Sequence, residues 1–178
     1  LGHKEIPFST VDSLGVIHIP LDKITIAGRY TLKARIAGNT RNEWDIWVYP
    51  AVKKPASGGY KYVRRWAEAK ELLQKGENVL LIPDSCAGRK AHFASHFWIM
   101  FNWKPMIVGT RIEHRHPVFR DFPTSYYADW QWWDILNYAT AVDLTDMPVL
   151  TPIIQSIDTY EVNRKLGISF EARVGSGK

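Results

Sequence analysis

Residues 62–82, YVRRWAEAKELLQKGENVLLI, carry the pattern that predicts the fold class. Apolar side chains recur at helical spacing in its first half, at Tyr62, Trp66, Ala69 and Leu73. Gly76 follows at a position where helices commonly end. Residues 79–82 are then apolar without alternation, a pattern typical of a strand buried on both faces of a parallel sheet. A helix, a glycine and a buried strand together predict an α/β fold with a mostly parallel sheet.

The residues upstream of this stretch predict antiparallel β structure. Polar and apolar side chains alternate from Arg29 to Ile36, and residues 44–49 form a second strand candidate before Pro50. Turn-forming residues lie between the two, so we expect a hairpin. The β-branched run at 16–19 is a further strand candidate.

Composition divides the chain into three parts. Residues 1–50 are the short antiparallel β segment, and three or four strands are too few for an independent sandwich. Residues 51–60 contain proline, serine, two glycines and two lysines, which is typical of a linker. Residues 61–178 form the expected α/β module, in which 125–142 contains a helix with Ser125 or Asp129 as its N-cap.

The overall composition excludes several classes of protein. Hydrophobic residues make up 46% and charged residues 23% of the 178 residues, as in globular domains. No apolar run approaches the ~18 residues of a membrane span. The first ten residues lack the pattern of a signal peptide, so we expect either a cytoplasmic protein or a piece of an exported chain. A net charge of +5 permits nucleic acid or anionic partners, but the basic residues are not concentrated and indicate solvated surface.

Tryptophan is the unusual residue in this composition, with eight copies, three of them within residues 130–133. On a helix these three indoles would cover more than one face, so they cannot all enter one core stripe. At least one is expected at a domain interface or at a ligand surface, where its apolar ring would suit the face of a sugar. The candidate interface or carbohydrate-binding residues are Asp129, Trp130, Gln131, Trp132, Trp133 and Asp134.

A nucleophilic enzyme is the alternative that the residues leave open. Cys86 follows the expected buried strand, and His92 and His96 are close in sequence, so a Cys–His pair is conceivable. His92 and His96 have the spacing of a zinc-binding helix, but Phe93 stands where that motif has its glutamate, and no metal is predicted. Asn42-Glu43 resembles a glycosidase acid/base dipeptide, but it lacks an identifiable partner carboxylate and is interpreted as turn chemistry.

Several segments resemble large bacterial proteins of glycoside hydrolase family 2, of the β-galactosidase-like or "sugar-binding domain" type. The resemblance covers nearly the whole chain. Its segments are 42–50, 116–119, 122–124, 129–134, 164–167 and 170–175. It implies an accessory region in which residues 1–50 are the tail of an immunoglobulin-like sandwich. The remainder would be a flavodoxin-like or amidotransferase-like module. The catalytic barrel of that family is not in this sequence, so no catalytic residue and no cofactor is carried over.

The sequence therefore predicts a non-catalytic accessory module of a larger glycoside hydrolase that cleaves β-glycosidic bonds. Its expected partners are the other domains of that protein, a glycan or a second copy of the chain, without nucleic acid or a membrane span. The resemblance implies a periplasmic or cell-surface location. A Cys86-dependent hydrolase of amidotransferase-like fold and a basic nucleic-acid-binding domain remain the two alternatives.

Overall fold

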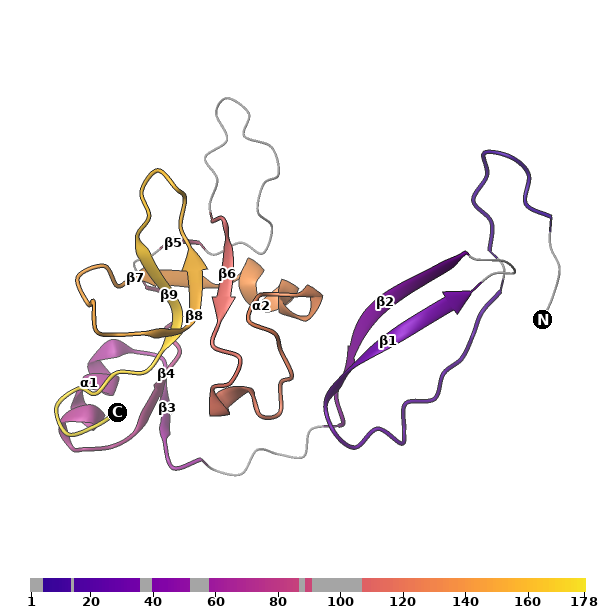
Figure 1. Ribbon diagram of the computed structural model, residues 1–178. Helices are drawn as coiled ribbons and strands as arrows, with labels where there is room; N and C mark the ends of the chain where they lie inside the picture. The colour runs from indigo at the N-terminus through magenta and orange to yellow at the C-terminus, as the bar shows by residue number, and fades with distance from the viewer. Residues whose placement is uncertain (1–4, 14, 36–39, 52–57, 87–88, 91–106) are drawn as a thin grey trace.

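The computed structural model describes residues 5–13, 15–35, 40–51, 58–86, 89–90 and 107–178 (Figure 1). Strands dominate the described residues, and they form three separate sheets. The strands are β1 (Gly28–Arg35), β2 (Arg41–Val48), β3 (Lys61–Val63), β4 (Val79–Leu81), β5 (Arg89–Lys90), β6 (Gly109–Ile112), β7 (Thr140–Asp143), β8 (Pro152–Ile157) and β9 (Lys165–Phe170). The helices are α1 (Trp66–Gln74) and α2 (Trp133–Asn137), with 3₁₀ turns η1 (Pro117–Phe119) and η2 (Trp130–Trp132).

The largest sheet contradicts the expected fold. It has five strands in the order β5-β7-β9-β8-β6, and every neighbouring pair runs antiparallel. Among the described residues only β3 and β4 pair in parallel. The module is therefore mostly β, and the prediction of a flavodoxin-like or amidotransferase-like parallel sheet was wrong. A run of apolar residues indicates a strand, but it carries no information on the direction of the neighbouring strand.

The stretch that suggested the parallel sheet does form a single β–α–β unit, β3–α1–β4. Helix α1 ends as expected: Gly76 has a φ of 82°, and the backbone N–H groups of Gly76 and Glu77 donate to the carbonyls of Leu73 and Leu72. The sheet does not extend beyond this pair, however, and Leu80 remains 42% exposed. The expectation of a strand buried on both faces was therefore wrong.

Residues 125–142, expected to contain a helix, do contain the short helix α2, which is preceded by η2 and followed by the start of β7. Asp129 caps the start of η2 as expected, because its carboxylate accepts a hydrogen bond from the N–H of Trp130 at 2.8 Å. The helix ends after Asn137, and the chain then enters β7 at Thr140, where strand pairing to β9 outweighs the helical pattern. Residues 16–19, which were expected to form a strand, are irregular in the structure.

The main hydrophobic core lies between β6, β8 and the short helical turns that cover them. Its buried members come from five elements. They are Ile112, Phe119, Trp132, Leu136, Ile153 and Ile154. The ring of Trp132 meets those of Phe119 and Phe122 edge-on, with centroids 5.8 and 5.0 Å away. This core fixes the segment 122–137 against the five-stranded sheet, which positions the tryptophan-rich residues.

The C-terminal residues close onto the β3–α1–β4 unit. The N–H of Val79 donates to the carbonyl of Lys178 at 2.7 Å, and the ammonium of Lys178 pairs with Glu171 at 2.5 Å. Figure 1 shows the C-terminus beside α1. The final turn thus ties the last strand of the large sheet to the small parallel pair.

Replacing Gly177 with alanine should loosen this contact. An added Cβ would lie 2.6 Å from the carbonyl oxygen of Glu77 and 2.8 Å from that of Leu73, so backbone must move. We expect a loss of about 1–3 kcal/mol in the free energy of unfolding, measured by urea denaturation. Gly59→Ala is the control, because its Cβ would meet nothing within 4 Å. Equal effects of the two substitutions would contradict this account of the close approach.

The β1–β2 hairpin stands apart from the other sheets in Figure 1 and confirms the expected pair of strands. Its eight residue pairs are in continuous register from Gly28↔Val48 to Arg35↔Arg41. Asn42 and Glu43 lie inside β2 rather than in the turn, which corrects their interpretation. One face of the hairpin is apolar, and the other is charged.

Candidate functional site

Two exposed indoles, those of Trp130 and Trp133, form an aromatic surface at the start of η2 and the start of α2. Trp130 is 70% exposed and Trp133 is 44% exposed, while Trp132 between them is only 2% exposed. The rings of the exposed pair have centroids 6.1 Å apart and planes inclined by 34°. The expectation that at least one indole stays exposed is confirmed, because η2 and α2 present only one side to the core.

The polar residues predicted beside these rings have different surroundings. Asp134 is exposed in the first turn of α2, where a carboxylate also suits the helix dipole. Asp129 is partly buried, and its carboxylate is engaged as the cap of η2. Gln131 points its amide into the protein, where its Nε2 donates to the carbonyl of Pro123 at 2.8 Å. Asp134 is therefore the predicted polar group that remains beside the exposed pair.

Gln131 also joins this segment to the hairpin, through Tyr49. The Tyr49 hydroxyl donates to Oε1 of Gln131, and the Tyr49 ring stacks on Phe122 with centroids 5.6 Å apart. Burial raises the pKa of the Tyr49 hydroxyl above its ordinary value, so this group is protonated and can donate at neutral pH. The tryptophan-rich segment thus lies beside the end of β2, as the interface hypothesis expected.

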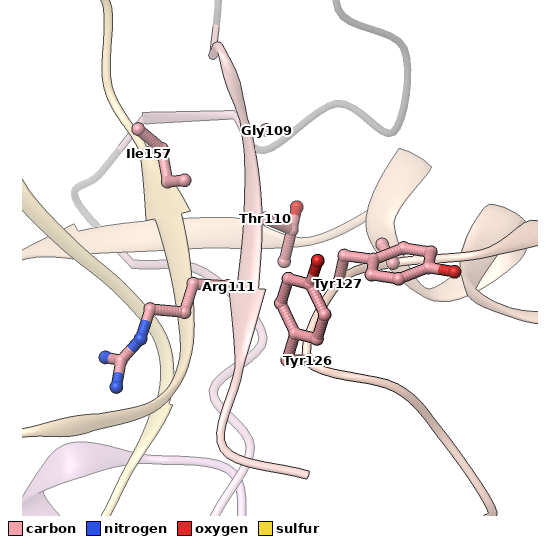
Figure 2. Close-up of a pocket in the computed structure, with 7 residues that line it drawn as sticks. Gly109, Thr110, Arg111, Tyr126, Tyr127 and Ile157 are labelled. Carbon is pink, nitrogen blue, oxygen red and sulfur yellow. The ribbon is translucent and has the colours of Figure 1, made fainter.

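A pocket that the sequence did not reveal lies between β6 and residues 126–128 (Figure 2). Its volume is about 470 Å³, and it is open to solvent. The rings of Tyr126 and Tyr127 meet edge-on, 5.0 Å apart. The residues that line the pocket are Gly109, Thr110, Arg111, Tyr126, Tyr127, Ala128 and Ile157.

The pocket supplies hydroxyl groups and aromatic surface rather than acid–base chemistry. Figure 2 shows the Thr110 side chain directed toward the tyrosines and the Arg111 side chain directed away from them. The guanidinium of Arg111 lies 3.7 Å from the carboxylate of Glu113. The two tyrosines of the pocket and the two exposed indoles belong to one continuous segment, 126–133, and all four rings are exposed to solvent.

The nucleophile candidates gain no support from the geometry. Cys86 is exposed, while His92 and His96 lie outside the described residues. Asp84, near Cys86 in sequence, hydrogen-bonds Arg64 at 2.5 Å, and this bond holds the pKa of its carboxyl below the ordinary value. Among the residues that the structure describes, no group of three histidine, cysteine or acidic side chains could hold a metal ion. Nor does any helix in that part of the chain combine the length and apolar character needed to cross a membrane.

Comparison with known proteins finds two family models along the chain. Residues 1–50 match a family described as "Domain of unknown function (DUF8488)". The search of curated proteins gives no match. Residues 61–178, about two thirds of the sequence, match a second family model and include the tryptophan-rich segment, the pocket and the main core. On the strength of that match, the chain belongs to the family described as "Domain of unknown function (DUF8487)".

Proposed function

We propose that this chain is a non-catalytic accessory module of a larger glycoside hydrolase, and that it binds carbohydrate on the Trp130–Trp133 face. The observation that carries the proposal is the exposure of two neighbouring indoles held by a rigid core. The resemblance of segments 42–50 and 129–134 to glycoside hydrolase family 2 supports the parent activity, the cleavage of β-glycosidic bonds. It also supports a bacterial parent exported to the periplasm or the cell surface.

The exposed aromatic surface of Trp130 and Trp133 is energetically unfavourable in water. Leaving a large apolar side chain exposed forgoes roughly 1.5–3 kcal/mol relative to burial, so exposed indoles favour a ligand or partner that covers them. Trp132 anchors the same turn through a 2.8 Å hydrogen bond from its Nε1 to Oγ1 of Thr124. The two exposed rings are therefore presented on a backbone segment that the core and this hydrogen bond hold in place.

Sugar rings suit this surface because their C–H faces are apolar while their edges carry hydroxyls. The inclined indoles offer two adjacent stacking positions, and the carboxylate of Asp134 can accept hydrogen bonds from hydroxyl groups. Binding sites of this kind combine apolar walls with a few polar groups that fix orientation. The tyrosine-lined pocket on the same segment provides additional aromatic surface.

The proposal is tested by calorimetric titration of the chain with neutral β-linked gluco- and galacto-oligosaccharides. Trp130→Ala and Trp133→Ala should each weaken binding by about tenfold or more, equivalent to a lost stacking contact of ~1.4 kcal/mol. Trp66→Ala is the matched control, since Trp66 is 57% exposed at the start of α1 and should leave the affinity unchanged. Absence of binding by the wild-type chain, or an equal loss in the control, would refute the proposed site.

A further inference from the structure

We propose that the tip of the β1–β2 hairpin is a binding site for the anionic groups of an acidic glycan, formed by Arg35 and Arg41. This inference extends the proposed carbohydrate binding to a substrate class, saccharides that carry carboxylate or sulfate groups. It concerns residues remote in sequence from the Trp130–Trp133 face. Figure 1 shows the end of β1 and the start of β2, where Arg35 and Arg41 lie, directed away from the five-stranded sheet.

The register of the hairpin brings two positive charges together. Arg35 is the last residue of β1 and Arg41 the first of β2, and the two are direct cross-strand partners. Both side chains are exposed. Directly opposed residues of an antiparallel pair have Cβ atoms about 4.5–5.5 Å apart, and like charges there destabilise the pair. The hairpin thus carries an unfavourable arrangement that a bound anion would relieve.

The other charges on the same face are already paired. The ammonium of Lys33 lies 3.5 Å from the carboxylate of Glu43, and the guanidinium of Arg29 lies 3.9 Å from that of Asp45. The hydroxyl of Thr31 also donates to Asp45 at 2.9 Å. No ion pair links Arg35 or Arg41 to another described residue. Positive charge is therefore uncompensated only at the tip of this face.

Two arginines on directly opposed positions of a hairpin can both reach one carboxylate or sulfate group. Each guanidinium is a planar fork of N–H donors that matches the oxygens of such anions, and charge-assisted hydrogen bonds of this type are stronger than neutral ones. An anion between Arg35 and Arg41 would accept hydrogen bonds from both and cancel their repulsion. A lysine at either position would supply charge without the fork.

The rest of the charged face favours a glycan over a nucleic acid. Glu43 and Asp45 interrupt the positive charge along the strands, whereas tight nucleic-acid binding relies on many phosphate contacts. Arg29 lies about 20 Å from Arg35 along β1, as estimated from the rise per residue of a strand. There Arg29 and Trp47 line a cleft of about 190 Å³. Its remaining lining is Pro123, Thr124 and Ser125, which adds hydroxyl groups suited to a saccharide.

The test measures binding to polygalacturonate, dextran sulfate and neutral dextran by surface plasmon resonance at about 0.15 M salt. The two acidic polymers distinguish carboxylate from sulfate as the recognised group. Arg35→Ala and Arg41→Ala should each weaken binding to the preferred acidic polymer at least tenfold. Lys33→Ala removes the same charge from the same face and should weaken it threefold or less. An equal loss in Lys33→Ala would overturn the site, because net charge alone would then explain the binding.

A second variant separates loss of the site from loss of folding. Arg41→Glu places a carboxylate opposite Arg35, so the hairpin should be stabilised and the thermal midpoint unchanged or raised, while acidic-polymer binding is lost. Retained binding in this folded variant would contradict the proposal. So would tighter binding of duplex DNA than of either glycan, since this would identify a nucleic-acid surface. Neutral-oligosaccharide binding that depends on Trp130 tests the proposed function separately, because Arg35→Ala should leave it unchanged.

Discussion

Trp132→Ala should lower the free energy of unfolding by about 3–5 kcal/mol, the largest single effect that we expect in this chain. The Trp132 side chain is 2% exposed and fills the core beneath η2. Its removal leaves a cavity beside Phe119 and Phe122, the rings that it meets edge-on. It also leaves the hydroxyl of Thr124 without the indole N–H that donates to it.

The effect of Trp132→Ala is measured by urea denaturation followed by far-UV circular dichroism. Trp66→Ala is the matched control, because this exposed indole should cost about 1 kcal/mol or less. A small loss in Trp132→Ala, similar to that in the control, would mean that the segment 122–137 is not packed on the sheet as described. The exposed indoles of Trp130 and Trp133 would then not be held in place by a packed core.

Arg164→Ala should cost about 2–3 kcal/mol of stability near neutral pH, because it leaves the carboxylate of Asp158 buried without its main partner. The Asp158 side chain has no exposed surface, and its Oδ2 accepts hydrogen bonds from the backbone N–H of Arg164 at 3.1 Å and from its Nε at 2.8 Å. Arg164 remains partly exposed, so solvent screens some of the interaction and we expect a smaller loss than for a fully buried ion pair. Arg120→Ala is the control, since its pair with Asp121 is almost fully exposed.

The same ion pair predicts how stability depends on pH. Burial raises the pKa of the Asp158 carboxyl, but the hydrogen bonds from Arg164 and Thr159 outweigh it and hold that pKa below the ordinary value. A carboxyl with a lowered pKa in the folded state stabilises the fold above its unfolded pKa of about 3.9, and this contribution disappears as the pH falls through the folded value. The stability difference between wild type and Arg164→Ala should therefore shrink as the pH falls below the unfolded pKa of about 3.9. A difference that stays constant as the pH falls below that value would exclude this role for Asp158.

The features that the sequence predicted correctly depend on neighbouring residues. The hairpin follows from strict alternation in β1, which only an extended strand places on two faces. Helix α1 and its end follow from the spacing of Ala69 and Leu73 and from Gly76, which adopts the positive φ that favours glycine. Asp129 caps η2 for an equally local reason, its side chain reaching the next backbone N–H.

The features that were missed depend on residues far apart in the chain. Strand β4 does pair in parallel with β3, but the apolar run around Leu80 does not reveal that this sheet ends at two strands or that the larger sheet is antiparallel. The Tyr49–Gln131 hydrogen bond joins residues 82 positions apart, and no local pattern announces it. The pocket at Thr110 and Tyr126 likewise forms only when β6 pairs with β8 and the following segment folds back.

The central claim, that Trp130 and Trp133 bind carbohydrate, is tested most directly by following the indole N–H signals in a two-dimensional ¹⁵N–¹H NMR spectrum during a glycan titration. Each tryptophan gives one such signal, and Trp→Phe variants assign them. We predict saturable shifts of the Trp130 and Trp133 signals, while those of buried Trp132 and of Trp66 stay in place. Saturable shifts confined to other tryptophans, or no shift of any indole with β-linked glycans at millimolar concentration, would contradict the account.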